Sequence, residues 1–179
     1  MSRPSQVVVL AEDERHVRFA RQHLYRMGHA HHDIRVEELP SGRGCGEQWV
    51  RERYARAVKA YRARSARAET ALMVVIDADT GDVDRRQFQG ALDEAGVAAC
   101  TGGEAIAHLV PKRNIETWVL CLSGRHVDED ADCRTEAGID VLIAASAATF
   151  FAWSRVNITP PAHCVPSLLA AIPEVRRLG

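Results

Sequence analysis

The stretch ALMVVIDADTGD, residues 71–82, carries the clearest fold signal in the sequence. Six apolar residues run directly into Asp77 and Asp79, and these two acids are separated by a single alanine. A short apolar run that ends in polar residues is typical of a strand buried on both faces of a parallel sheet. We therefore expect a strand over 71–76 whose carboxyl end presents two aspartates.

The same pattern recurs along the chain. QVVVLA (6–11) is another apolar run, DIRVEEL (33–39) alternates weakly, and AIAHLV (105–110) is a fourth strand candidate. Between these runs, apolar residues recur at helical spacing. Alternating strands and helices predict an α/β fold, with a mostly parallel, Rossmann-like sheet of about four strands and helices on both faces. The helical patterns cover 17–27, 50–68 and 88–95, and a further one begins at 115.

The alternation weakens beyond Gly124. HVDEDAD (126–132) is typical of a solvated acidic loop, residues 139–153 of an apolar helix, and 166–178 of a helical tail. We therefore predict a core over residues 1–124 and a mostly helical C-terminal extension, 125–179, that packs on it within a single domain.

Composition excludes several classes of protein. The chain has 179 residues, of which 46% are hydrophobic and 26% charged, with a formal net charge of −1, so a wholesale nucleic-acid coat is excluded. No apolar run approaches the roughly 20 residues that span a bilayer, and no secretory leader is recognisable. The five cysteines show no CxxC spacing and are expected to be reduced thiols. These features predict a soluble, cytoplasmic protein.

Charged residues follow three of the predicted strands: EDE (12–14), DAD (77–79) and PKRNIE (111–116). The carboxyl ends of parallel strands meet at one edge of the sheet, which is where such folds bind ligands. Crowded carboxylates repel one another and need a cation or a shared proton. Hard oxygen ligands suit Mg²⁺ or Mn²⁺, which can activate water and neutralise a phosphate.

These motifs resemble the Toprim fold of topoisomerases, primases, OLD-family nucleases and small defence-associated bacterial proteins. In that family a strand ends in Glu-Gly before a helix, and a later strand ends in Asp-x-Asp. VVVLAEDERH places Glu12 at the glutamate, and MVVIDADTGD places Asp77 and Asp79 at the acidic pair. PKRNIETWVL (111–120) and VPSLLAAIPEVRRL (165–178) resemble later family motifs, so the likeness covers roughly residues 6–122 and the C-terminus.

The resemblance implies an Mg²⁺- or Mn²⁺-dependent nuclease that hydrolyses phosphodiesters; it favours DNA over RNA as the substrate but leaves both open. Glu12 would transfer protons and bind metal, with Asp77 and Asp79 as further ligands. The resemblance also suggests a role in anti-phage defence beside an ATPase encoded nearby. Asp13 replaces the family glycine, so Glu12, Asp13 and Glu14 all stay open as the catalytic acid, although the register favours Glu12.

Other charged residues are candidates with a structural alternative. Glu116 could be catalytic, or it could be a first-turn acid in a helix capped by Asn114. Lys112 is a catalytic candidate that, with Arg113, could hold a phosphate. The long helix carries an excess of basic residues that could follow a nucleic-acid backbone or form a solvated face. The nucleic-acid-binding candidates are Arg51, Arg56, Lys59, Arg62 and Arg113.

Three other functions start from similar motifs. A haloacid-dehalogenase-like phosphatase would use Asp77 as nucleophile and Asp79 as acid/base, but that motif usually opens its domain. A receiver-like signalling domain resembles the first strand, yet it places its lysine before a proline, whereas Lys112 follows Pro111. The domain could also be a non-catalytic partner of an ATPase.

Overall fold

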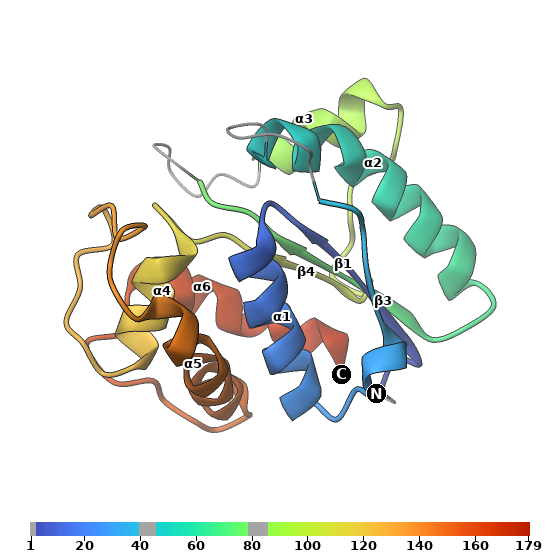
Figure 1. The fold of residues 1–179 in the computed structure, drawn as a ribbon. Coiled ribbons are helices and arrows are strands. Elements are labelled where there is room, and N and C mark those ends of the chain that lie inside the picture. The colour runs from blue at the N-terminus through green and yellow to red at the C-terminus, as the bar shows by residue number, and fades with distance from the viewer. Residues whose placement is uncertain (1–2, 40–45, 79–85) are drawn as a thin grey trace.

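The computed structural model describes residues 3–39, 46–78 and 86–179 (Figure 1). Within these residues, four strands form one sheet in the order β2-β1-β3-β4, and every neighbouring pair is parallel. The predicted α/β fold with a parallel sheet is confirmed. The strands are β1 (Gln6–Ala11), β2 (Ile34–Val36), β3 (Thr70–Val75) and β4 (Ile106–Leu109).

Helices cover both faces of this sheet, also as predicted. In Figure 1, α2 and α3 lie on one side of the strands, while α1, α4, α5 and α6 lie on the other. The helices are α1 (Glu14–Arg26), α2 (Gly46–Ser65), α3 (Arg86–Glu94), α4 (Ile115–Leu122), α5 (Ile139–Ser154) and α6 (Pro166–Val175), with 3-10 turns η1 (His31–Asp33) and η2 (Arg176–Leu178).

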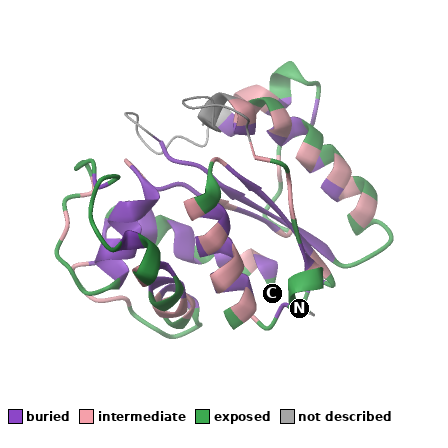
Figure 2. Ribbon diagram, in the orientation of Figure 1, coloured by how far each residue is buried: buried purple, intermediate pink, exposed green. Residues whose placement is uncertain are grey.

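The residues of the central strands β1 and β3 are buried on both faces except for the partly buried Gln6, which explains their largely apolar sequence (Figure 2). Side chains alternate across the sheet, so Val7 and Val9 pack with α1, whereas Val8 and Leu10 pack with α2 and α3. On the α1 side, the ring of Phe19 lies 5.7 Å from that of Phe150, measured between centroids. The sheet therefore separates two apolar cores.

The strand predicted at 33–39 is shorter than expected. Only Ile34–Val36 pairs with β1, and one further bond runs from the Glu37 N–H to the Val9 carbonyl, at 2.9 Å. β2 lies at the edge of the sheet, where short strands limit unwanted pairing with other chains. The strands predicted at 71–76 and 105–110 differ from β3 and β4 by one residue at their ends, within the usual uncertainty of boundaries.

The C-terminal segment contributes to the core on the α1 side. Ile139, Phe150 and Leu168 belong to the same apolar cluster as Val7 of β1. Helix α6 lies along the outer edge of the sheet, where the Glu174 carboxylate accepts a hydrogen bond from the backbone N–H of His108, at 3.1 Å. This bond satisfies an edge donor that β4 has no strand neighbour to pair.

The described cysteines are all free thiols, namely Cys100, Cys121, Cys133 and Cys164. None of the helices in the described ranges combines the length and the apolar character that a membrane-spanning segment requires.

Candidate metal site

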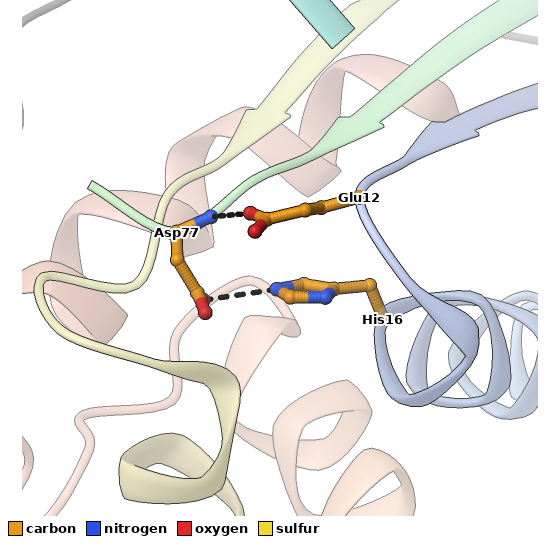
Figure 3. A group of neighbouring side chains, drawn as sticks. All are labelled: Glu12, His16 and Asp77. Carbon is orange, nitrogen blue, oxygen red and sulfur yellow. Dashed lines mark hydrogen bonds and ion pairs between the residues drawn. The ribbon is translucent and has the colours of Figure 1, made fainter. Parts of the chain in front are cut away.

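The strand order brings the acids after β1 and β3 together. Ala11 pairs with Val75, so both strands end at the same level of the sheet. Glu12 follows β1 directly, and its carboxylate accepts a hydrogen bond from the backbone N–H of Asp77, at 3.1 Å. β1 and β3 are neighbours in the sheet, and Glu12 and Asp77 therefore lie together at its carboxyl edge (Figure 3).

The first turn of α1 adds a histidine to this edge. His16 points from α1 toward the end of β3, and its Nε2 lies 2.9 Å from Asp77 Oδ1 (Figure 3). Asp13 caps the helix by accepting a hydrogen bond from the His16 backbone N–H at 3.0 Å. The same carboxylate oxygen lies 2.8 Å from His16 Nδ1. The imidazole is therefore held between two carboxylates.

These contacts decide the charge of the cluster. Complete burial alone would lower the pKa of His16, but the carboxylates of Asp77 and Asp13 outweigh burial and raise the pKa well above its usual value. Burial would also raise the pKa of Asp13, yet the hydrogen bond and charge of His16 hold that pKa well below its usual range. Asp77 is buried and has a second cation nearby, Arg134, whose Nη2 lies 3.6 Å from Asp77 Oδ2.

Glu12, His16 and Asp77 form a possible metal-binding cluster. Each offers one ligand atom, and these atoms all lie within 4.8 Å of one another. Carboxylate oxygens suit Mg²⁺ and Mn²⁺, whereas imidazole nitrogen suits transition metals. Asp13 stands where outer-sphere carboxylates usually orient a ligating histidine through its other nitrogen. The donor set can hold a divalent cation, and the histidine favours Mn²⁺ over Mg²⁺.

The three candidate acids after β1 have different surroundings. Glu12 belongs to the cluster, Asp13 caps α1, and Glu14 is exposed. Asp79, the second aspartate of the predicted pair, lies outside the described residues. Of the three acids that follow β1, Glu12 is therefore the one that lies close to the Asp77 carboxylate after β3.

Glu116 and Lys112 do not join the Glu12–His16–Asp77 cluster among the described residues. Glu116 is buried in the first turn of α4, and its carboxylate lies 2.5 Å from a guanidinium nitrogen of Arg15. Asn114 caps that helix, as the structural alternative predicted. Lys112 lies 2.8 Å from Asp130 in the acidic loop. Glu116 and Lys112 therefore each form an ion pair that gives the side chain a structural role.

The basic residues of α2 fall into two groups. Helix α2 returns the chain from the carboxyl edge of the sheet to its opposite edge (Figure 1). Arg56 and Lys59 are exposed, although the Lys59 ammonium donates to the Ala95 carbonyl at 3.2 Å. Arg62 contacts both carboxylate oxygens of Glu104, at 2.6 and 3.1 Å, and donates to the carbonyls of Ala98 and Ala99.

The four contacts of Arg62 connect α2 to the segment before β4, which is a structural role. Arg51 is only partly exposed and has an interaction partner, as does Arg113. Arg56 and Lys59 are therefore the predicted nucleic-acid contacts whose exposure best suits that role.

Sequence reasoning missed His16 and Arg134. The sequence did contain a signal for His16. A helix-capping side chain such as that of Asp13 accepts a hydrogen bond from the backbone N–H three residues later, which here is His16. That residue then lies in the first helical turn, over the end of the preceding strand. Arg134 lies in a loop that is distant from Asp77 in sequence, and no spacing rule connects them. Comparison of the chain with protein-family models, curated proteins and solved structures found no match in any of the three.

Proposed function

We propose that this chain is a metal-dependent nuclease that hydrolyses phosphodiester bonds at the Glu12–His16–Asp77 cluster. The observation that carries the proposal is this cluster's position at the carboxyl ends of two adjacent parallel strands. Ligands of open α/β sheets gather at that edge. The Toprim-like pattern of the sequence supplies the reaction class, and the geometry supports it by joining Glu12 to Asp77.

A divalent cation at such a site neutralises phosphate charge and makes water a better nucleophile near neutral pH. Asp77 and His16 would hold the cation, whose binding would displace the proton that His16 Nε2 holds against Asp77, with Asp13 orienting the imidazole from behind. The histidine makes Mn²⁺ a better fit than Mg²⁺. Asp79 stays a candidate ligand from the sequence pattern.

Glu12 is the proposed proton-transfer group. It is partly exposed, whereas Asp77 and His16 are buried, so its carboxylate is the one in the cluster that solvent and substrate reach most easily. Arg134 beside Asp77 adds positive charge close to the site. The Arg134 guanidinium would help to hold a phosphate group, on which negative charge increases in the transition state.

The exposed Arg56 and Lys59 would supply part of the sequence-independent affinity for nucleic acid. DNA as substrate, an ATPase partner, anti-phage defence and a cytoplasmic location are further parts of the proposal. They rest on the sequence pattern and the family resemblance alone.

The test is cleavage of plasmid DNA, single-stranded DNA and RNA with Mn²⁺ by the full chain and by Glu12→Gln. The amide cannot accept a proton, so turnover should fall by roughly two orders of magnitude, the usual scale for loss of general acid–base catalysis. Glu14→Gln, which changes an exposed neighbouring acid, should keep full activity.

Full activity in Glu12→Gln would remove Glu12 from the mechanism. Mass spectrometry after incubation with acetyl phosphate distinguishes the nuclease from the phosphatase and receiver alternatives, because only the latter two form a phosphate adduct on an aspartate. An adduct at Asp77 would contradict the nuclease proposal. Salt-sensitive DNA binding without cleavage in the presence of Mn²⁺ would favour the non-catalytic partner.

A further inference from the structure

A separate cavity lies on the other face of the sheet, beside the edge strand β4. Its volume is about 330 Å³, at the lower end of the range for small-molecule sites. None of the three residues in the candidate metal cluster lines it. The side chains used below come from α2, α3, β4, η2 and the segment before β4: Tyr54, Phe88, Cys100, His108 and Arg177.

Three rings form the walls of this cavity. The centroid of Phe88 lies 4.9 Å from that of Tyr54 and 4.7 Å from that of His108. The third pair, Tyr54 and His108, lies at 5.5 Å with the rings close to edge-on. Aromatic rings attract one another in offset and edge-to-face arrangements, and they recognise a further planar ring in the same way.

The polar groups of the wall are connected in a chain. The Glu174 carboxylate only accepts, so His108 Nδ1–H donates to it across 3.3 Å. Nε2 is then left to accept from the Tyr54 hydroxyl at 2.8 Å, and that hydroxyl can accept from the Cys100 thiol at 3.2 Å. Burial raises the pKa values of Tyr54 and Cys100, so both keep their protons.

The side chains of Tyr54, Cys100 and His108 therefore keep little hydrogen-bond capacity on their part of the wall, whereas Gln89 and Thr101 add polar groups elsewhere in the lining. Each polar proton of these three side chains already has an acceptor, and Glu174 lies buried behind His108. A ligand group that lies against these three side chains would find few hydrogen-bond partners on that side. This part of the wall therefore suits an apolar ring.

Arg177 adds one cation to the lining. Its Nη2 lies 3.5 Å from Glu174 Oε1, which fixes the guanidinium near the rim, and its side chain is 29% exposed. A guanidinium has five N–H donors in a planar fork, more than a single carboxylate oxygen can accept. The remaining donors suit the carboxylate of a ligand, which such a fork binds through two parallel hydrogen bonds.

We propose that this cavity is a binding site for a small aromatic carboxylate. The ring of the ligand lies against Phe88 and His108, and its carboxylate pairs with Arg177. The volume limits the ligand to one or two rings. The site is independent of the candidate metal cluster, so neither proposal depends on the other.

Cys100 is a natural reporter for this site, because its half-buried thiol lines the cavity. The experiment follows iodoacetamide labelling of Cys100 by peptide mass spectrometry, with and without indole-3-acetate. Calorimetry measures the affinity in parallel. Indole-3-acetamide is the matched probe, since it keeps the ring and lacks the charge.

We expect indole-3-acetate to bind at millimolar concentration or below and to slow Cys100 labelling at least several-fold. The labelling of the buried Cys133 and Cys164 should not change. Indole-3-acetamide should bind about tenfold more weakly, as expected for loss of one charge-assisted contact. Arg177→Gln should remove that tenfold difference, and Phe88→Leu should weaken both probes.

Three results would overturn the proposal. The first is that neither probe binds at millimolar concentration. The second is binding of indole-3-acetate without protection of Cys100, which would place the ligand elsewhere. The third is equal affinity for the two probes, which would exclude the Arg177 contact without relying on any variant.

Discussion

His16 and His23 lie two turns apart on α1, and both side chains are completely buried. His16 lies between Asp77 and Asp13, which raise its pKa well above the usual value. His23 packs against Phe150, with ring centroids 4.9 Å apart, and neither of its ring nitrogens makes a hydrogen bond of good geometry among the described residues, although the Ala147 backbone is near enough to act on the ring. Burial lowers the pKa of His23 to about 4, and the backbone of Ala147 offsets this only in part.

Burial of a histidine is therefore not by itself a sign of function. The same residue type on one helix is held charged or neutral by what that helix meets at each turn. The first turn of α1 meets the carboxyl ends of β1 and β3, where acids gather. The turn that carries His23 meets α5, which offers aromatic rings. Partners, rather than depth, separate the candidate site from the core.

The largest difference between the two histidines should appear when each is replaced by leucine. His16→Leu removes the closer of the two cationic partners of the buried Asp77 carboxylate and leaves Arg134, at 3.6 Å, as the other. Breaking a buried ion pair from one side typically costs about 3 kcal/mol or more, so the free energy of unfolding should fall by about that much near neutral pH. Urea denaturation in metal-free buffer measures it, and calorimetry should show that Mn²⁺ binding is also lost.

His23→Leu is the matched control for this experiment. It replaces a buried ring whose nitrogens make no hydrogen bond of good geometry among the described residues, so the free energy of unfolding near neutral pH should change by no more than about 1 kcal/mol. Mn²⁺ binding should be unaffected. Equal destabilisation by both substitutions would mean that the ion-pair partners of His16 contribute no more to stability than the apolar surroundings of His23.

The second prediction concerns the pH dependence of stability. The pKa of His23 falls from 6.5 to about 4 on folding, so below pH 6.5 the unfolded chain binds a proton that the folded chain does not. This contribution to the free energy of unfolding is fully present above pH 6.5 and is lost as the pH falls toward 4. Below pH 4, His23 causes no further loss. The loss attributable to His23 amounts to roughly 3 kcal/mol.

Urea denaturation of the full chain and of His23→Leu across this pH range tests the prediction. The variant should lose less stability on acidification by about that amount. His32→Leu removes an imidazole that is exposed in η1 and should follow the unmodified chain. Identical pH profiles for the chain and His23→Leu would contradict the assignment of a neutral, buried His23.

The sequence predicted α1 and its buried stripe, because Val17, Ala20 and Leu24 recur at helical spacing. It could not distinguish His16 from His23, since both positions border that stripe. The difference depends on which elements pack against each turn. Strand order also decides the site, because Glu12 meets Asp77 only when β1 and β3 are neighbours.

Charge within the site was predicted only in part. Acids after strands imply like-charge crowding, for which removing Asp77 would relieve repulsion. The structure instead places His16 and Arg134 beside Asp77, so the carboxylate has cationic partners. Arg134 comes from a loop, and loop contacts depend on tertiary packing that leaves no periodic signal in the sequence.

The smallest expected effect concerns Asp13, the outer carboxylate that distinguishes the surroundings of His16 most simply. Asp13→Asn keeps the helix cap, because asparagine caps helices about as well as aspartate. It removes only the negative charge that faces His16 Nδ1 at 2.8 Å. Losing an outer-sphere partner typically weakens metal binding 10- to 100-fold. An amide oxygen still accepts a hydrogen bond, so the lower figure of about tenfold applies.

Calorimetric titration with Mn²⁺ measures this loss of affinity, with Glu14→Gln as the control for loss of one exposed charge at the same helix end. A tenfold loss in both variants would assign the effect to general electrostatics. A loss in Asp13→Asn alone would support His16 as a ligand oriented by Asp13.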